Sequence, residues 1–320
     1  MTSRPSAYSE QRELERRLEV LRLPVTPLTP VGWLHGPPGT VWEREPECLG
    51  VGPDGLAYVV RRARQQARRR LVTVHDGGRW PVATIELHDH DVPFRASFVQ
   101  PLPGGRILLV AARNQQGPNA EIWSADGERE HRGDLGDAIE HVLTTPEGAI
   151  WVGYFDEALG SRGPGAHGLV RFDDTLATTW LYPFDAGLPT ILDCYALTVT
   201  GETVWHCAYS GFHIGSVRGG HAADHGEAPR HSATALLIEG RHGALAGGHG
   251  AEYDLVTPFR LDPDGIVPHG PARRLVLPDG MELHGVRTVT RGATLHVFRH
   301  TGWWRIALGE LTDDSTSPRR

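Results

Sequence analysis

One motif recurs along this chain and limits the folds that are open to it. Its clearest copy lies between Thr145 and Asp174, where a Pro-Glu-Gly turn precedes a β-rich run from Ala149 to Tyr154. An acidic, glycine-rich loop follows, and then a second β-rich run from Leu169 to Phe172. Strands joined by tight turns and repeated at a regular period indicate a β-propeller.

Six copies of the inner hairpin can be identified, each with an apolar strand, a turn that contains glycine and a second apolar strand. They begin at Glu47, Ser97, Glu140, Cys194, Ala235 and His284. The starts are 50, 43, 54, 41 and 49 residues apart, close to the roughly 40 to 50 residues of one propeller blade. We therefore expect an all-β chain folded as a six-bladed β-propeller.

The outer strands are less regular. Third strands are expected at 71–74, 121–124, 169–172, 213–217, 256–261 and 303–308. Fourth strands are expected at 82–87, 178–182 and 273–277, and the signal for one is poor in the second and fourth blades. The sixth blade runs out of chain near Leu311, whereas Val31 to Leu34 has no partner strand before it. Pairing these two segments would close the ring and remove an exposed edge.

This reading divides the chain into three parts. Residues 1–24 form a tail and a short helix, residues 25–311 form one propeller domain, and the polar residues 312–320 form a disordered tail. In the helix Ser9 is the expected N-cap, Leu14, Leu18 and Leu21 share one stripe, and Pro24 ends it. Two roles stay open: packing across one propeller face, or binding a protein partner through residues 9–23.

Composition excludes several classes of protein. A net charge of −7 disfavours a nucleic-acid surface. The N-terminus lacks the apolar core of a secretory signal, and no apolar run is long enough to span a membrane. Three widely spaced cysteines do not form a disulfide framework. A cytoplasmic location is therefore expected, with Cys48, Cys194 and Cys207 as free thiols.

The texture of these hairpins, a Pro-Asp-Gly or Pro-Glu-Gly turn followed by an apolar run with Trp or Tyr, resembles known propellers. It is similar to the six-bladed gluconolactonase, strictosidine-synthase-like and NHL groups, and also to the seven-bladed streptogramin lyases. The resemblance covers about Glu47 to Leu308. No catalytic motif of these families is matched residue by residue, so the resemblance implies a fold and no activity.

A ring of polar residues is expected at the mouth of the central channel, where the inner strands begin. The ring consists of the six hairpin starts, with Asp193 replacing Cys194 if the alignment on the turn glycine is strict. Glu47, Glu140 and His284 each stand eight residues before a turn glycine, which predicts equivalent directions for their side chains. Two carboxylates and an imidazole there can bind one divalent metal ion or act as acid and base. Alternatively, some of them are out of register and bond only to local backbone.

Further candidates lie at the ends of the second strands, which reach the same face. Asp156 joins the candidate catalytic group, and it would orient the substrate together with Arg113. The other candidate substrate-binding residues are Tyr154, Tyr209, His249 and His300.

Three other polar segments give weaker signals. His88 and His90 would point the same way in an extended segment and could share a metal, although two histidines without a third ligand more often mark a solvated loop. His221, Asp224 and His225 are expected in the loop that enters the fifth blade. The arginine-rich run 61–70 is interpreted as a long solvated loop rather than as an anion site.

Two functions from different classes fit these observations. The first is an enzyme that acts on a small polar molecule at the channel mouth, by metal-assisted hydrolysis or by acid–base elimination. The second is a non-catalytic propeller that binds a protein or a small ligand on the same face. A polar ring that converges in one pocket with a shifted pKa would favour the enzyme, and a broad exposed apolar face would favour the scaffold.

Overall fold

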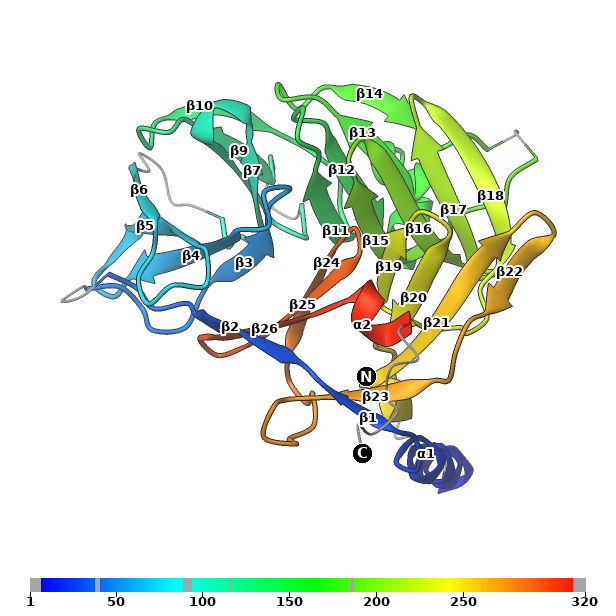
Figure 1. The fold of residues 1–320 in the computed structure, drawn as a ribbon. Helices are drawn as coiled ribbons and strands as arrows, with labels where there is room; N and C mark the ends of the chain where they lie inside the picture. Colours follow the sequence, from blue (N-terminus) through cyan, green and yellow to red (C-terminus); the bar gives the residue numbers. More distant parts are fainter. Residues whose placement is uncertain (1–6, 38–40, 89–93, 115–116, 185–186, 313–320) are drawn as a thin grey trace.

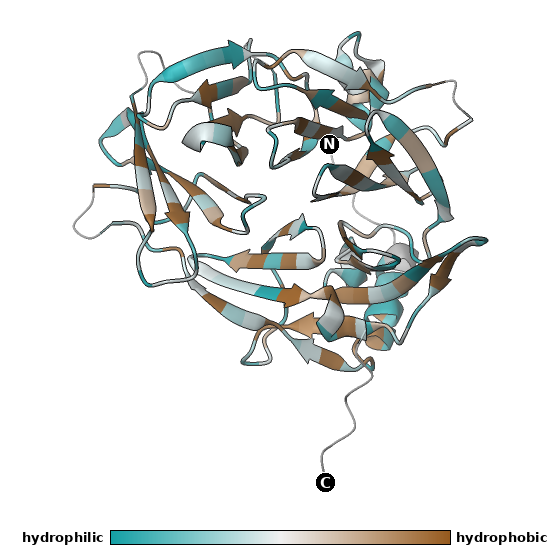
Figure 2. Cartoon of the chain, turned by 45° about the horizontal axis from the view of Figure 1, so that its top comes forward, coloured by the Kyte–Doolittle hydropathy of each residue, from teal (hydrophilic) through white to brown (hydrophobic). Residues whose placement is uncertain are grey.

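Six sheets surround a central axis in the computed structural model, which describes residues 7–37, 41–88, 94–114, 117–184 and 187–312 (Figure 1). Figure 2 views the ring from a tilted direction and shows the blades arranged around its centre. Each sheet is one blade, and the first strand of every hairpin repeat lies innermost. The predicted six-bladed β-propeller is confirmed.

The first four blades each contain four antiparallel strands that follow one another in sequence. Blade one has β3 (Cys48–Val51), β4 (Ala57–Ala63), β5 (Gln66–His75) and β6 (Ala83–His88). Blade two has β7 (Phe98–Leu102), β8 (Arg106–Val110), β9 (Ala120–Trp123) and β10 (Arg129–Gly133). Blade three has β11 (Ile139–Thr144), β12 (Ile150–Tyr154), β13 (Leu169–Phe172) and β14 (Thr178–Leu181). Blade four has β15 (Asp193–Thr200), β16 (Thr203–Tyr209), β17 (His213–Arg218) and β18 (His221–Glu227).

The last two blades use strands from both ends of the chain. Blade five has β19 (Ala235–Glu239), β20 (His242–Ala246), β21 (Leu255–Asp262), β22 (Gly265–Pro268) and β23 (Arg273–Val276), and β1 (Val25–Pro27) pairs parallel with β23. Blade six has β24 (Arg287–Arg291), β25 (Thr294–Arg299) and β26 (Gly302–Ala307), with β2 (Thr29–Trp33) antiparallel to β26. The predicted closure of the sixth blade by the N-terminal strand is confirmed. Helix α2 (Leu308–Thr312) follows β26.

The ring is stabilised by apolar packing between blades. In the described part of the chain, six larger clusters of buried apolar side chains each combine residues of two neighbouring blades. The cluster between the sixth and first blades includes Leu34, Val59 and Phe298, so the N-terminal segment is built into the closure. Short 3-10 turns occupy some of the connections: η1 (Pro103–Gly105), η2 (Asp156–Gly160), η3 (Pro164–His167) and η4 (Gly250–Glu252).

The arginine-rich run is not the solvated loop that the sequence suggested. It spans the end of β4, a tight turn and the start of β5, and Arg61 and Arg70 are wholly buried. Arg61 donates to the carbonyl oxygen of Leu34, and Arg70 forms an ion pair at 2.8 Å with buried Glu121 of blade two. Arg61 therefore joins β4 to the N-terminal segment through a neutral oxygen, and Arg70 joins blades one and two through a carboxylate, since buried charged groups need hydrogen-bond partners.

Two predictions about the outer strands also need correction. Blades two and four have complete fourth strands, β10 and β18, where the sequence signal was poor. His221, Asp224 and His225 consequently lie in β18 and not in a loop. His88 ends β6, and His90 lies outside the described residues.

Helix α1 (Ala7–Val20) lies outside the ring, beside blade five (Figure 1). It begins two residues before Ser9, so Ser9 is not its N-cap. The predicted stripe is largely exposed, with exposed fractions of 60%, 49% and 42% for Leu14, Leu18 and Leu21. Arg16 and Arg17 anchor the helix instead, through ion pairs with Glu252 at 2.7 Å and Asp254 at 2.6 Å. The helix therefore does not cross a propeller face, and a protein partner bound through residues 9–23 stays a prediction.

The cysteines and the membrane prediction can be checked directly. Cys48, Cys194 and Cys207 are all free and buried, and Cys207 lies in the second strand of its blade as predicted. Among the described residues, no helix is both long and apolar enough to cross a membrane.

Candidate active site at the channel mouth

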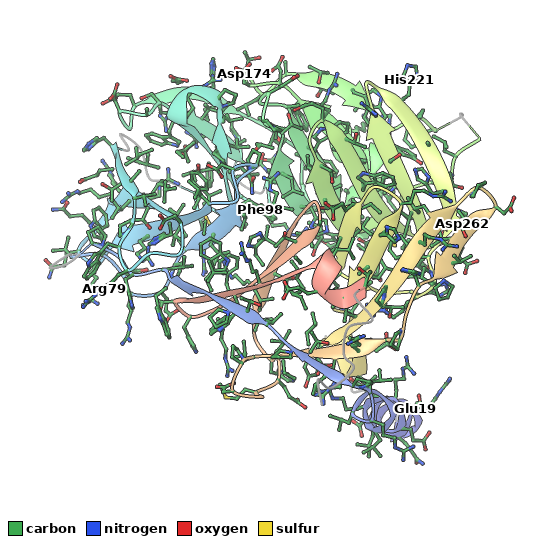
Figure 3. The ribbon with its side chains drawn as sticks, in the orientation of Figure 1. Glu19, Arg79, Phe98, Asp174, His221 and Asp262 are labelled. Carbon is green, nitrogen blue, oxygen red and sulfur yellow. The ribbon has the colours of Figure 1, made fainter. Side chains whose placement is uncertain are left out.

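Three adjoining cavities, of about 190, 230 and 440 Å³, hollow the channel and its mouth. The smallest is the channel itself, between the inner strands. It shares Glu140 and Thr234 with the 230 Å³ cavity, which we call the acidic cavity. It shares Leu49, Phe98, Thr288 and Val289 with the 440 Å³ cavity, which we call the cationic cavity. In Figure 3 Phe98 lies near the centre of the ring, whereas Arg79, Asp174, His221 and Asp262 lie on its periphery.

The acidic cavity is lined by ionisable and aromatic side chains from three neighbouring blades. Glu140 comes from β11, Asp193 begins β15, and His249 follows β20 immediately before η4. Phe155, Tyr195 and Thr234 complete its lining. Blades three to five thus deliver two carboxylates, from their inner strands β11 and β15, and an imidazole, from the segment after β20, to one place.

Both carboxylates of the acidic cavity have raised pKa values. Burial, together with the negative charges of Asp156 and Glu140, raises the pKa of Asp193 to about 6. Glu140 is open to the mouth, yet burial of its charge among the cavity walls still raises its pKa. The His249 imidazole opposes the rise for both groups. Asp193 can therefore exist in either protonation state near neutral pH, as an acid or base requires.

An aromatic wall flanks these groups. The Tyr195 ring meets His249 edge-on, with ring centroids 5.6 Å apart, and contacts Phe212 in the same manner at 5.2 Å. Tyr209, the last residue of β16, adds its half-exposed ring 6.3 Å from that of Tyr195. Burial and the nearby Asp193 charge raise the pKa of the Tyr195 phenol, which keeps it a neutral hydrogen-bond donor. Such a wall limits water around the carboxylates and offers a flat apolar surface to a ligand.

The far end of the channel is crossed by one arginine. Arg291, the last residue of β24, donates to the carbonyl oxygens of Val51 at 2.7 Å and Thr144 at 2.6 Å, and to the side-chain oxygen of Gln100. These acceptors belong to blades one, three and two. Burial lowers the pKa of Arg291 to about 9. The site is consequently a cup that is open at one face, with a positively charged floor.

The structure does not bring Glu47, Glu140 and His284 together. Glu47 is buried and accepts from Arg62 at 2.6 and 2.8 Å and from the backbone amide of Ala96 at 2.7 Å. His284 packs against the Tyr253 ring, with centroids 4.7 Å apart, and lines none of the three cavities. The described residues contain no group of three His, Cys, Asp or Glu side chains that could hold a metal ion.

The error for His284 has a definite cause in the hairpin turns. In blade three the strand ends at Thr144, four residues before the turn glycine, because five residues separate the paired Thr144 and Ile150. In blade six Arg291 pairs with Thr294, so the turn glycine follows the strand end directly. Counting back from the glycine therefore overshoots by three residues. Counted from the strand end, the sixth-blade equivalent of Glu140 and Glu47 is Arg287.

The remaining predicted residues lie at the rim of the acidic cavity or away from it. Asp156 is close enough to Asp193 for its charge to raise the pKa of that carboxyl, and the Tyr209 ring lies beside that of Tyr195. Arg113 lies over the Phe155 ring at 4.8 Å and forms an ion pair with Glu157 at 2.6 Å, so it supports this rim from outside. Tyr154 is wholly buried and donates to the carbonyl oxygen of Leu135, which makes its role structural. 

His300 also lies away from the mouth. It is exposed, 3.5 Å from Glu45, and it lines a separate cavity with Trp33 and Met281.

Sequence reasoning missed Tyr195, Arg95 and Arg287, and it placed Asp193 only as an alternative to Cys194. An alignment of the hairpins strictly on the turn glycine gives Asp193. Recognition of the two-residue turn in the sixth hairpin would have given Arg287. Arg95, which precedes β7 and lines the cationic cavity, carries no sequence signal.

Comparison with known proteins finds only distant structural similarity. No protein-family model matches this sequence, and no curated protein matches it. A solved streptogramin B lyase is 14% identical with a TM-score of 0.48, over 81% of this chain and 77% of its own. A gluconolactonase from Xanthomonas campestris is 14% identical with a TM-score of 0.45, over 87% and 88%. A chain of a nidogen–laminin complex is 10% identical with a TM-score of 0.44, over 71% and 79%.

Gluconolactonases and streptogramin lyases were the groups that the hairpin texture resembled, and solved structures of both are found again here. These proteins are similar to this chain in fold alone. At such identities and TM-scores they say nothing about what this chain binds.

Proposed function

We propose that the channel mouth is the active site of an enzyme that performs acid–base elimination on a small polar molecule. The observation that carries this proposal is the acidic cavity, where Asp193, with a pKa of about 6, shares one wall with Glu140 and His249. Two carboxylates held close together in a partly desolvated site titrate as a coupled pair, so that one is protonated while the other is ionised.

In the proposed reaction Glu140 is the base and Asp193 the acid. Glu140 takes a proton from a carbon of the substrate, and the electron pair of that C–H bond forms a carbon–carbon double bond. The leaving group departs with its bonding electrons and takes the proton of Asp193. Proton exchange with solvent then restores both carboxyl groups. His249 stabilises whichever carboxylate is ionised, and the aromatic ring of Tyr195 restricts water beside them.

Turnover of an unidentified substrate can be tested without guessing its structure. The purified protein is incubated with an extract of small metabolites, and mass spectrometry follows which compounds are consumed. Because acid–base groups contribute about 10²- to 10⁴-fold to rates, Asp193→Asn and Glu140→Gln should each slow consumption at least about 100-fold. Asp264→Asn, in an exposed turn, is the matched control. Equal consumption by Asp193→Asn, or none by the wild type, would count against catalysis.

The second candidate function is binding without chemistry. The half-exposed ring of Tyr209 beside Tyr195 and Phe212 favours it, because aromatic rings at a pocket rim commonly hold ligands. If this function is correct, extract compounds are retained by the protein unchanged, and Asp193→Asn retains them equally.

A divalent cation, expected from the sequence, is an alternative use of the same two carboxylates, with a different set of ligands, because a bound cation would keep both of them ionised. Glu140 and Asp193 would supply carboxylate oxygens. With only two charged ligands we expect weak binding, with a dissociation constant on the order of 10⁻⁴ to 10⁻³ M. Calorimetric titration with calcium should give such a value for the wild type and no binding for Glu140→Gln. Equal binding by both proteins would place the cation elsewhere.

A further inference from the structure

The wall of the mouth opposite the acidic cavity is positively charged. Arg95 and Arg287, from the start of blade two and the first residue of β24, line the 440 Å³ cationic cavity. Ser97 and Thr288 add hydroxyl groups to the same lining. Arg287 stands four residues before the end of its strand, as Glu47 does in blade one, and both residues line this cavity.

The carboxylate of this cavity does not neutralise these two arginines. Both oxygens of Glu47 accept from Arg62, at 2.6 and 2.8 Å, and one also accepts from the Ala96 amide. The Glu47 side chain is only 3% exposed, so little of it faces a ligand. Within the described residues, neither Arg95 nor Arg287 forms an ion pair.

A third cation lies deeper on the same axis. Arg291 is surrounded by neutral oxygens, two backbone carbonyls and the amide of Gln100, rather than by a carboxylate. Gln100 also lines the channel cavity, next to Thr290. A charge that is paired only with dipoles in a low-dielectric interior exerts a long-range field. That field favours negative charge in the channel, on the side away from Glu140 and Asp193.

From this distribution of charge we propose an oxyanion subsite at Arg287 and Arg95, which binds a carboxylate or phosphate group of the ligand. Guanidinium groups bind both oxyanions through paired hydrogen bonds, and the hydroxyls of Ser97 and Thr288 can donate to remaining oxygens. This proposal rests on the proposed function, because the oxyanion subsite and the proposed acid–base pair lie at the same channel mouth. It restricts the substrate class to small molecules that carry an oxyanion at one end and the reacting carbon at the other.

Calorimetric titration at low ionic strength tests the subsite, with sodium phosphate and sodium succinate as separate probes. Removal of a charged hydrogen-bond partner should weaken binding at least about tenfold, so Arg287→Gln and Arg95→Gln should each lose that much. Arg287→Lys should recover part of the loss because it keeps the charge. Arg218→Gln is the matched control, since Arg218 is an exposed arginine at the end of β17. Circular dichroism confirms that each variant is folded.

The two probes and one further variant separate the possible outcomes. Tighter binding of phosphate identifies a phosphorylated ligand, and tighter binding of succinate identifies a carboxylate. Asp193→Asn should bind the probe at least as well as the wild type, so oxyanion binding persists even if the proposed chemistry is wrong. Failure of the wild type to bind either probe, or equal binding by Arg287→Gln and Arg218→Gln, overturns the subsite.

Discussion

Arg17 donates hydrogen bonds to both carboxylate oxygens of Asp254, at 2.6 and 3.0 Å, and so links helix α1 to blade five. Asp254 is buried directly before β21 and also accepts from Arg274 at 2.9 and 2.8 Å. Arg17 bonds in addition to the carbonyl oxygen of Ala251, within η4. The helix therefore holds the loop that presents His249 to the acidic cavity.

Removing the helix should leave the ring intact. After deletion of residues 1–23, Asp254 keeps its bonds to Arg274, and strands β1 and β2 remain. We expect thermal unfolding within a few degrees of the full-length protein. Deletion through Leu34 removes β2 and exposes the edge of β26, and each unmet backbone group costs about 1 to 3 kcal/mol. It should lower the melting temperature by more than about 10 °C. Similar melting of both truncations would contradict the closure.

The raised pKa of Asp193 predicts how its replacement changes stability with pH. Its folded pKa of about 6 lies above its usual range, so the stability it contributes is full at low pH and is lost as pH rises through 6. Asp193→Asn should therefore raise the melting temperature at pH 8 and change it little at pH 4. Melting curves across this range, with Asp264→Asn as control, check the sign. A variant that is less stable at pH 8 than the wild type would refute the assignment.

Arg291 should be essential to stability, because it connects three other blades at the channel floor. Arg291→Met leaves three inward-facing oxygens without their donor, and each buried acceptor left unpaired costs about 1 to 3 kcal/mol. Urea unfolding should show this loss, with an intermediate loss for Arg291→Lys. The exposed Arg64→Gln serves as the control. A loss below about 1 kcal/mol would mean that water replaces the guanidinium.

The three cysteines should react only after unfolding. Burial raises the pKa of the Cys48 and Cys194 thiols above the usual range and that of Cys207 to about 12, which suppresses the reactive thiolate. Titration with a thiol reagent should find no fast-reacting group in the native protein and three in denaturant. Fewer than three groups in denaturant, without added oxidant, would count against the expected cytoplasmic location.

The fold could be predicted because its signals are local. A Pro-Glu-Gly turn requires a glycine at positive φ, as at Gly148 with φ of 93°, and the apolar runs around it have strand length. Edge removal then placed the N-terminal strand on β26. Apart from the pairing of β2 with β26, none of these inferences depends on a contact between residues that are distant in the sequence.

The site could be predicted only in part, because it depends on register. Hairpin turns of unequal length displaced the sixth-blade position from Arg287 to His284. Asp193 stands eight residues before Gly201, but a register shift between Cys194 and Ala196 changes its position relative to the other blades. The carboxylate of Glu47 is bonded to Arg62, which is fifteen residues away in the sequence, and no strand pattern predicts that ion pair. The leucine stripe of α1 predicted burial, but ion pairs with distant Glu252 and Asp254 decided how the helix docks.

The central claim is that the channel mouth holds an acid–base pair. Its most direct test is a pH titration of Asp193, in which carbon-13 NMR monitors the carboxyl group. We predict a pKa of about 6 in the wild type. It should fall in Asp156→Asn and in Glu140→Gln, because both replacements remove a negative charge that favours the protonated form. A pKa near the usual value of roughly 3.9, unchanged by either replacement, would show that no acid–base pair exists at the channel mouth.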